Sequence, residues 1–161
     1  MGTMLRISDA ASLAMHMAVY LADHPDKVVS VQEAASALGV SDNHLSKVCQ
    51  RLKKAGILMT VRGPRGGFIL ARKPDDITLL DVYEAIDGCA KPQPCLLGRD
   101  KCVRSRCVMG DLAAAVNEMV MDYFAGTTIA GGSIDSRDSK KIKMRRNESC
   151  QQCSATNVSR R

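Results

Sequence analysis

Apolar residues recur at helical spacing near the start of the chain. Between residues 8 and 22, Leu13, Met17 and Leu21 fall on one face of a helix. Ser8 stands where an N-cap is expected, and Pro25 follows the end of the pattern. The pattern therefore predicts an amphipathic helix over 8–22.

The next two predicted helices are short and are joined by a tight turn. Ser30 caps the first, with Glu33 at the capping-box position, and Gly39 ends it. Ser41 caps the second, and Gly56 closes it. The apolar positions of this second helix follow the i, i+3, i+4, i+7 spacing and are Leu45, Val48, Cys49 and Leu52. Two helices joined through residues 39–41 predict a helix-turn-helix.

Two short strands are predicted directly after this motif, at 57–62 and 68–72. The intervening sequence Gly-Pro-Arg-Gly-Gly at 63–67 has the composition of a hairpin turn. A hairpin that follows a helix-turn-helix is a wing. The expected fold is mainly α with a small β-wing, that is, a winged helix-turn-helix domain.

Two further helices are predicted beyond the wing. Thr78, with Asp81 three residues on, caps one that ends at Gly88. The last runs from about 108 to 125 and carries one apolar stripe, made of Leu112, Val116, Met119, Val120 and Tyr123. That stripe requires a partner, either another helix of this chain or its copy in a second subunit. The expected organisation is a DNA-binding domain at 1–88, a cysteine-rich loop at 89–107, a long dimerisation helix at 108–126 and a disordered basic tail at 127–161.

Composition agrees with a helical protein that works in the cytoplasm. Hydrophobic residues make up 45% of the 161 residues, but aromatics only 3%, so Ala, Leu, Val and Met must fill the core. No run approaches the roughly 18 apolar residues of a membrane span. The N-terminus lacks the charged-then-apolar order of a secretory signal. No membrane partner is expected.

The net charge of +6 becomes informative once it is located along the chain. Residues 1–136 hold 15 Lys or Arg and 15 Asp or Glu, so the excess lies in the tail. Within this balanced body, residues 43–74 contain eight basic side chains and no acidic one. Such a segment indicates a surface that faces a polyanion, although a solvated basic face is the alternative.

The polar face of the second helix-turn-helix helix has the side chains that DNA recognition needs. Asn, Gln, Ser and Lys can bond base edges, while Arg and Lys neutralise phosphates. Arginines that flank a wing tip fit a phosphate or a minor groove. The candidate contacts to double-stranded operator DNA are Ser41, Asn43, His44, Ser46, Lys47, Gln50, Arg51, Lys54, Arg62 and Arg65.

Four of the seven cysteines lie within 19 residues, at Cys89, Cys95, Cys102 and Cys107. In a cytosolic chain this clustering indicates metal or redox chemistry. An iron–sulfur cluster, a structural zinc ion and a thiol switch are the alternatives, and zinc fits less well because the paired C-x2-C spacing is missing. A thiol oxidoreductase would need C-x2-C at the start of a helix, whereas the one such pair, Cys150 and Cys153, lies in the tail. An enzyme is therefore not expected.

Several of these segments together resemble the Rrf2 family of bacterial regulators. The resemblance covers about residues 4–125 and is most specific in the wing. It lies in Arg6-Ile7-Ser8, Leu13-Ala14-Met15-His16, Leu45-Ser46-Lys47-Val48, the stretches 52–57 and 61–68, and the stretch 77–82. It implies a homodimer on a partly palindromic operator, with the long last helix crossing to the partner.

The resemblance also implies a [2Fe-2S] or [4Fe-4S] cluster held by three loop cysteines. Members similar to the cluster-biogenesis repressor space them C-x5-C-x5-C with a following His; here the first three loop cysteines carry one extra residue, and Ser105 stands at the His position. Members that sense nitric oxide place the last cysteine at the start of the dimer helix, which suits Cys107. Their fourth ligand comes from the partner's first helix, where this chain has Ser12, so His16 or Asp9 could substitute, or the four loop cysteines could suffice. The expected function is a dimeric DNA-binding regulator that senses redox, nitric oxide or iron–sulfur status, with a cluster-free thiol switch as the alternative.

Overall fold

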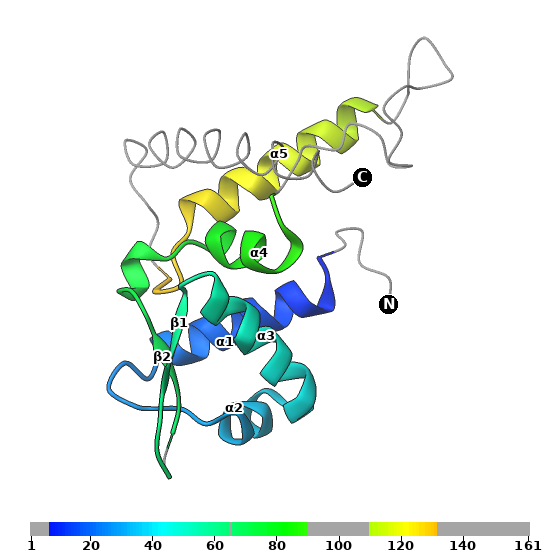
Figure 1. Ribbon diagram of the computed structural model, residues 1–161. Helices are drawn as coiled ribbons and strands as arrows, with labels where there is room; N and C mark the ends of the chain where they lie inside the picture. Colours follow the sequence, from blue (N-terminus) through cyan, green and yellow to red (C-terminus); the bar gives the residue numbers. More distant parts are fainter. Residues whose placement is uncertain (1–6, 65, 90–109, 132–161) are drawn as a thin grey trace, which may run out of the picture.

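The computed structural model describes residues 7–64, 66–89 and 110–131 of the chain. Helices dominate these ranges, together with one two-stranded antiparallel sheet (Figure 1). The elements are α1 (Asp9–Ala22), α2 (Val31–Leu38), α3 (Asp42–Lys54), β1 (Leu58–Val61), β2 (Gly67–Leu70), the 3-10 helix η1 (Pro74–Asp76), α4 (Leu79–Asp87) and α5 (Gly110–Gly126). The predicted winged helix-turn-helix with a long additional helix is confirmed. No helix in these ranges is both long and apolar enough to cross a membrane.

The predicted caps start the first four α-helices. The hydroxyls of Ser8, Ser30, Ser41 and Thr78 each accept a hydrogen bond from the backbone amide three residues later. Each such cap stabilises its helix by about 1 kcal/mol. At α4 the capping box is complete, because the Asp81 carboxylate also accepts from the Thr78 amide at 3.2 Å.

The capping box predicted at Ser30 forms only in part. The Ser30 hydroxyl accepts from the Glu33 amide at 3.1 Å. The Glu33 carboxylate, however, accepts from Lys27 at 2.5 Å and from the Tyr20 hydroxyl at 3.4 Å. A charged donor within reach is a stronger partner for a carboxylate than a backbone amide.

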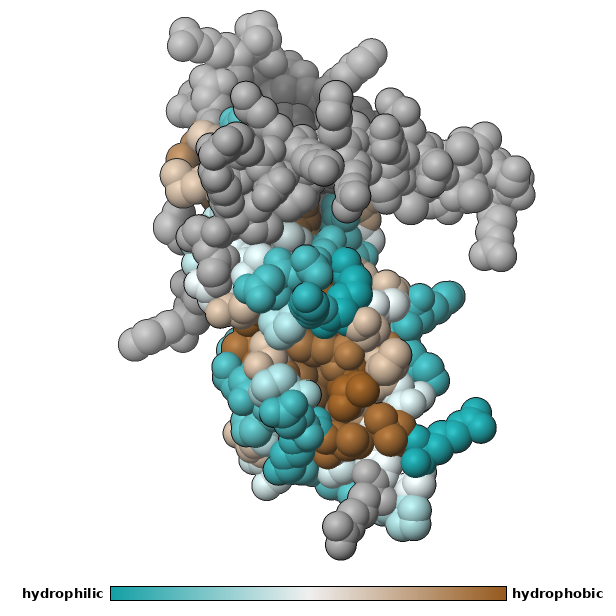
Figure 2. Space-filling model, turned by 90° about the vertical axis from the view of Figure 1, so that its left-hand side faces the viewer, coloured by the Kyte–Doolittle hydropathy of each residue, from teal (hydrophilic) through white to brown (hydrophobic). Residues whose placement is uncertain are grey.

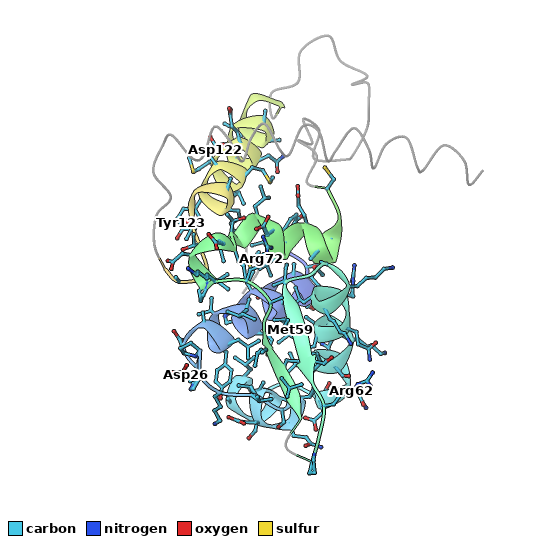
Figure 3. The ribbon with its side chains drawn as sticks, turned by 60° about the vertical axis from the view of Figure 1, so that its left-hand side comes forward. Asp26, Met59, Arg62, Arg72, Asp122 and Tyr123 are labelled. Carbon is cyan, nitrogen blue, oxygen red and sulfur yellow. The ribbon has the colours of Figure 1, made fainter. Side chains whose placement is uncertain are left out.

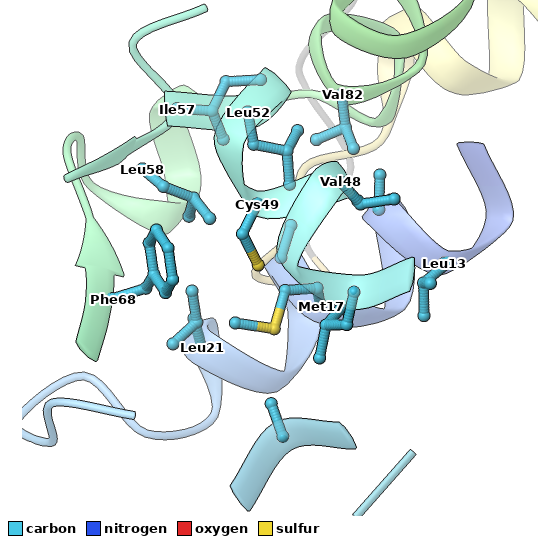
Figure 4. Packing of buried hydrophobic residues seen from close by; sticks show 14 of the residues in the cluster. Leu13, Met17, Leu21, Val48, Cys49, Leu52, Ile57, Leu58, Phe68 and Val82 are labelled. Carbon is cyan, nitrogen blue, oxygen red and sulfur yellow. The ribbon is translucent and has the colours of Figure 1, made fainter. Parts of the chain in front are cut away.

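One hydrophobic core joins α1 to the helix-turn-helix, the wing and α4 (Figure 4). Helix α1 lies at its centre and packs against α3, α4 and β2. Met17 and Leu21 of α1 are buried against the apolar face of α3, and Phe68 of β2 completes this side of the core. The aromatic-poor composition is therefore sufficient for a closed core in which aliphatic side chains and methionine interlock.

The wing is attached to the connection between α1 and α2. Its two strands pair from Leu58↔Leu70 to Val61↔Gly67, which is shorter than the predicted strands at 57–62 and 68–72. Val29 donates to the Phe68 carbonyl at 3.1 Å and accepts from the Phe68 amide at 2.8 Å. The connection thus adds an isolated bridge to the outer edge of β2.

Residues 127–131 pass back beside the start of α4. The Leu79 amide donates to the Thr127 carbonyl and the Ile129 amide donates to the Ile77 carbonyl, both at 3.0 Å. Ile129 is 2% exposed and belongs to the main core. The prediction of a disordered tail from residue 127 is therefore wrong for 127–131, since two backbone bonds and one buried isoleucine hold this segment; the rest of the expected tail lies outside the described residues.

Helix α5 packs on α4 at the end of the molecule opposite to α2 and the hairpin tip (Figure 1). Ala113, Phe124 and Ala125 are its buried side chains, and the rings of Phe124 and Tyr83 lie 5.9 Å apart. Much of the predicted apolar stripe is instead exposed, with Leu112 59%, Met119 72% and Tyr123 63% accessible. Val120 packs against the cluster of Leu80, Phe124 and Ala125, whereas the exposed members of the stripe are not covered by the described part of this chain.

The close approach of the wing to Val29 requires a glycine at position 67. A Cβ on Gly67 would lie 2.3 Å from the Val29 carbonyl oxygen, and that atom belongs to backbone that cannot rotate away. We expect Gly67→Ala to lower the free energy of unfolding by about 1–3 kcal/mol, the usual cost of overpacking. Urea unfolding followed by circular dichroism measures this.

Gly126→Ala is the matched control, since a Cβ there meets nothing within 4 Å. Its unfolding free energy should not fall, and should rise by up to about 1 kcal/mol, because alanine replaces a glycine of α5 without a clash. Equal stability of the two variants would contradict the close approach of Val29 to the wing.

Candidate nucleic-acid interface

The helix-turn-helix is shaped by the three residues between α2 and α3. Gly39 ends α2 in the left-handed conformation, at φ 67°, and the Val40 amide donates to the Ala35 carbonyl at 3.0 Å. Ser41 then starts α3 at once by accepting from the His44 amide. Because glycine adopts this φ without strain, the chain reverses within one turn and α3 packs across α2.

Helix α3 has one buried and one exposed face, as the sequence predicts. Its apolar side chains Leu45, Val48, Cys49 and Leu52 are at most 2% exposed. Of the predicted DNA contacts on α3, Ser46 is half-buried, and the others are exposed: Ser41 at the N-cap, Asn43, His44, Lys47, Gln50, Arg51 and Lys54. Packing of the apolar face therefore fixes which polar side chains are presented to solvent.

Cys49 belongs to the core and not to the loop chemistry. It is fully buried, and burial raises the pKa of its thiol to about 11. The thiol is consequently neutral near pH 7 and behaves as a small hydrophobic side chain.

The electrostatics of α3 suit a polyanion. Among the described residues the ion pairs are Lys27–Glu33 and Arg72–Asp81, and neither uses a side chain of α3. The one acidic side chain of α3, Asp42, lies in its first turn, where it complements the helix dipole. The ammonium groups of Lys47 and Lys54 are thus available to phosphates.

The exposed surface of the wing carries a basic side chain and an apolar area. Arg62 is exposed directly after β1 (Figure 3), whereas Arg65 lies outside the described residues. Met59 is 47% and Val61 37% exposed on the outer side of β1, and Figure 2 shows an apolar area over the hairpin bordered by hydrophilic side chains. This apolar area was not predicted from the sequence, although Met59 and Val61 stand two residues apart in β1 and therefore share one face of the strand.

Arg51 differs from the other exposed side chains of α3. Its guanidinium donates to the main-chain carbonyl of Ile86, in the last turn of α4. From the sequence alone Arg51 is a candidate DNA contact, and that assignment stays a prediction; the position of the end of α4 beside Arg51 is a result of tertiary packing.

Only the start of the cysteine loop falls within the described residues. Cys89 is half-buried and follows Gly88, whereas Cys95, Cys102 and Cys107 lie outside. Among residues 7–64, 66–89 and 110–131, no group of three His, Cys, Asp or Glu side chains could hold a metal ion. Three of the four proposed thiol ligands thus lie outside the described residues, and the set stays a prediction.

The candidate fourth ligands lie on α1. His16 is exposed, with its Nδ1 2.7 Å from the Ser12 carbonyl, and Asp9 is exposed in the first turn. The Ser8 hydroxyl donates to the Asp87 carboxylate at 2.8 Å, so the start of α1 meets the end of α4 within one chain. Asp9 therefore lies close to the start of its own cysteine loop.

Comparison with known proteins identifies the class. The family model described as "Rrf2: Iron-dependent Transcriptional regulator" matches residues 7–131. A helix-turn-helix-type transcriptional regulator of Aquifex aeolicus is 36% identical over 125 residues, which span 76% of this chain and 87% of that protein. The regulator IscR of Aliivibrio salmonicida is 26% identical over 128 residues, 79% of this chain and 74% of that protein.

The chain is also similar in sequence to a third regulator over a shorter range, and in fold to two solved structures. NsrR of Halalkalibacterium halodurans is 34% identical over 76 residues, covering 47% of this chain and 52% of NsrR. The fold is similar to that of IscR from T. potens, with a TM-score of 0.64, 26% identity and coverage of 80% and 85% of the two chains. It is also similar to CymR, the global cysteine regulator of B. subtilis, with a TM-score of 0.66, 23% identity and coverage of 78% and 94%.

We expect Lys47 on the exposed face of α3 and Arg62 of the wing to contact DNA, and a binding assay tests this. The probe is a duplex selected in vitro by the wild-type chain from a random library. Lys47→Ala and Arg62→Ala should each weaken binding about 5- to 20-fold, and a lost phosphate contact should reduce the slope of log affinity against log salt by about 0.9. Fluorescence anisotropy at several salt concentrations measures both quantities.

Lys73→Ala is the control, because it removes the same charge beside η1, at the base of the wing. Its affinity and slope should stay close to those of the wild type. Unchanged binding by both Lys47→Ala and Arg62→Ala would show that the reading surface is wrongly assigned.

Proposed function

Because the chain belongs to the Rrf2 family of transcriptional regulators, we propose that it acts in the cytoplasm as a homodimer whose operator affinity follows an iron–sulfur cluster in residues 89–107. The observation that carries the DNA-binding part is the exposed polar face of α3 beside Arg62 of the wing. The curated relatives are named as regulators, and no enzymatic activity is proposed.

The exposed stripe of α5 supports a dimer. Leu112, Val116, Met119 and Tyr123 lie on one side of a 17-residue helix and are 40–72% exposed. When a second copy covers an apolar stripe of this length, its surface is removed from water, and this burial lowers the free energy of the dimer. Two copies joined through α5 would present two α3 helices, as a partly palindromic operator requires.

The composition of the loop supports a thiolate-bound cluster. Cys89, Cys95, Cys102 and Cys107 supply four sulfur donors, which suit iron–sulfur clusters. The family description includes iron dependence. When bound, a cluster would supply a centre whose oxidation state or integrity responds to oxidants or nitric oxide.

The chain's own residues would convert that response into altered DNA binding. Cys89 follows α4 after a single glycine, and α4 packs against α1, α3 and α5. A change at residue 89 therefore acts on the helix that lies between the reading helix and the predicted dimer helix. Operator affinity shifts only if the two loop states favour different geometries of these helices.

The dimer is tested with a substitution on the exposed stripe. Met119→Glu should convert the dimer into a monomer at micromolar concentration and weaken binding to the selected duplex at least tenfold, because two carboxylates would then be buried at the interface. Met119 is 72% exposed in the single chain, so the fold itself should be retained. Analytical ultracentrifugation measures the change in mass.

Glu118→Gln, at the neighbouring exposed position of the same helix, is the control and should remain dimeric. A monomeric wild-type chain that still binds the selected duplex would refute the dimer.

The cluster is tested by anaerobic purification of the full chain. We expect iron and acid-labile sulfide in comparable amounts, and their loss in Cys95→Ala and in Cys102→Ala. The double variant Cys150→Ala/Cys153→Ala should retain both, because its cysteines lie in the tail. Metal analysis and visible absorbance give the result.

The other outcomes identify the alternatives. Zinc without sulfide would indicate a structural zinc site. A colourless, metal-free chain that binds the duplex tightly would refute the cluster, and reversible loss of that binding on oxidation would favour a thiol switch.

A further inference from the structure

The last turn of α4 holds α1 and α3 together through two polar contacts. Arg51 of α3 donates to the Ile86 carbonyl, and Ser8 at the start of α1 donates to the Asp87 carboxylate at 2.8 Å. The same Ser8 hydroxyl caps α1 by accepting from the Ala11 amide at 3.0 Å. Two consecutive residues of α4 therefore connect to the two helices that form the centre of the core.

The carbonyl that Arg51 binds is one of those that a helix leaves without an intrahelical partner. The final four carbonyls of a helix lack such partners, and a cation beside them also offsets the negative end of the helix dipole. Arg51 follows the buried Val48 by three positions, so it stands at the edge of α3 that faces α4. Lys47 and Lys54 are exposed on the outward face and make no such contact with the part of the chain that the structure describes.

We propose that Arg51 is a positioning residue that sets the orientation of α3 from the end of α4, and that it transmits changes arising at Cys89. Gly88, with a φ of 82°, and Cys89 follow the contacted turn directly. A shift of this turn moves the Ile86 carbonyl, and the guanidinium carries the shift to the last turns of α3. This inference deepens the proposed function and rests on α3 being the reading helix.

Salt-dependent binding distinguishes a positioning role of Arg51 from a phosphate contact. A residue that binds phosphate releases counterions, so its loss reduces the salt slope, whereas a positioning residue changes affinity at constant slope. Arg51→Ala should weaken binding to the selected duplex about tenfold while keeping the wild-type slope. Arg51→Lys keeps the charge, but its side chain is one atom shorter and ends short of the Ile86 carbonyl, so its affinity should fall as in Arg51→Ala.

Two control variants are measured in the same salt titration of DNA binding. Lys47→Ala should lower the slope by about 0.9, and Lys73→Ala reports the effect of removing a charge elsewhere. A slope reduced by about 0.9 in Arg51→Ala, with full rescue by Arg51→Lys, would overturn the proposal and make Arg51 a DNA contact. If Lys47→Ala and Arg62→Ala also leave binding unchanged, the proposed function itself has failed.

A second measurement tests whether Arg51 transmits changes from the cysteine loop to α3. If Arg51 were only a structural contact, its loss would not alter the response of DNA binding to changes in the loop. The full chain, freed of metal by a chelator, is compared with its thiols reduced and after alkylation by N-ethylmaleimide; buried Cys49, with a pKa of about 11, should stay unmodified. We expect alkylation to change wild-type affinity at least fivefold, and Arg51→Ala to show less than half of that change on a logarithmic scale. Equal responses of wild type and variant, or no response of the wild type, would overturn transmission through Arg51.

Discussion

Burial of one face of α3 against α1 is the interaction on which the rest of the structure depends. Leu45, Val48 and Leu52 are almost completely removed from water, and Met17 and Leu21 of α1 lie opposite them. Each large aliphatic side chain buried in this way contributes about 1.5–3 kcal/mol. Because this face of α3 is buried in the core, its polar face has one orientation available, and that orientation exposes Lys47 to solvent.

The wing is held to the same core by its edge. The paired hydrogen bonds between Val29 and Phe68 attach β2 to the α1–α2 connection, and Phe68 also inserts its ring into the core. A two-stranded hairpin is marginally stable alone, so these contacts give the wing a defined position relative to α3. The proposed reading helix α3 and the wing are therefore held in one fixed arrangement by the same core.

The end of α4 is where the DNA-binding part meets the start of the cysteine loop. Contacts from Ser8 and Arg51 converge on this turn, and Cys89 follows it within two residues of Asp87. At its other end, α4 begins beside residues 127–129, which directly follow α5. Helix α4 thus contacts α1, α3 and α5 and directly precedes the cysteine loop. A change in its position would therefore affect all of these elements.

Local patterns in the sequence determined the helices, their caps, the turn at Gly39 and the exposed face of α3, because spacing and cap chemistry act over a few residues. They could not show the contact between Arg51 and Ile86, since it joins positions 35 residues apart. Nor could they show that residues 127–131 are ordered, because this segment is held by backbone bonds to Ile77 and Leu79 that leave no local signature. Local chemistry therefore set which side chains α3 exposes to solvent, whereas tertiary packing decided that Arg51 binds the end of α4.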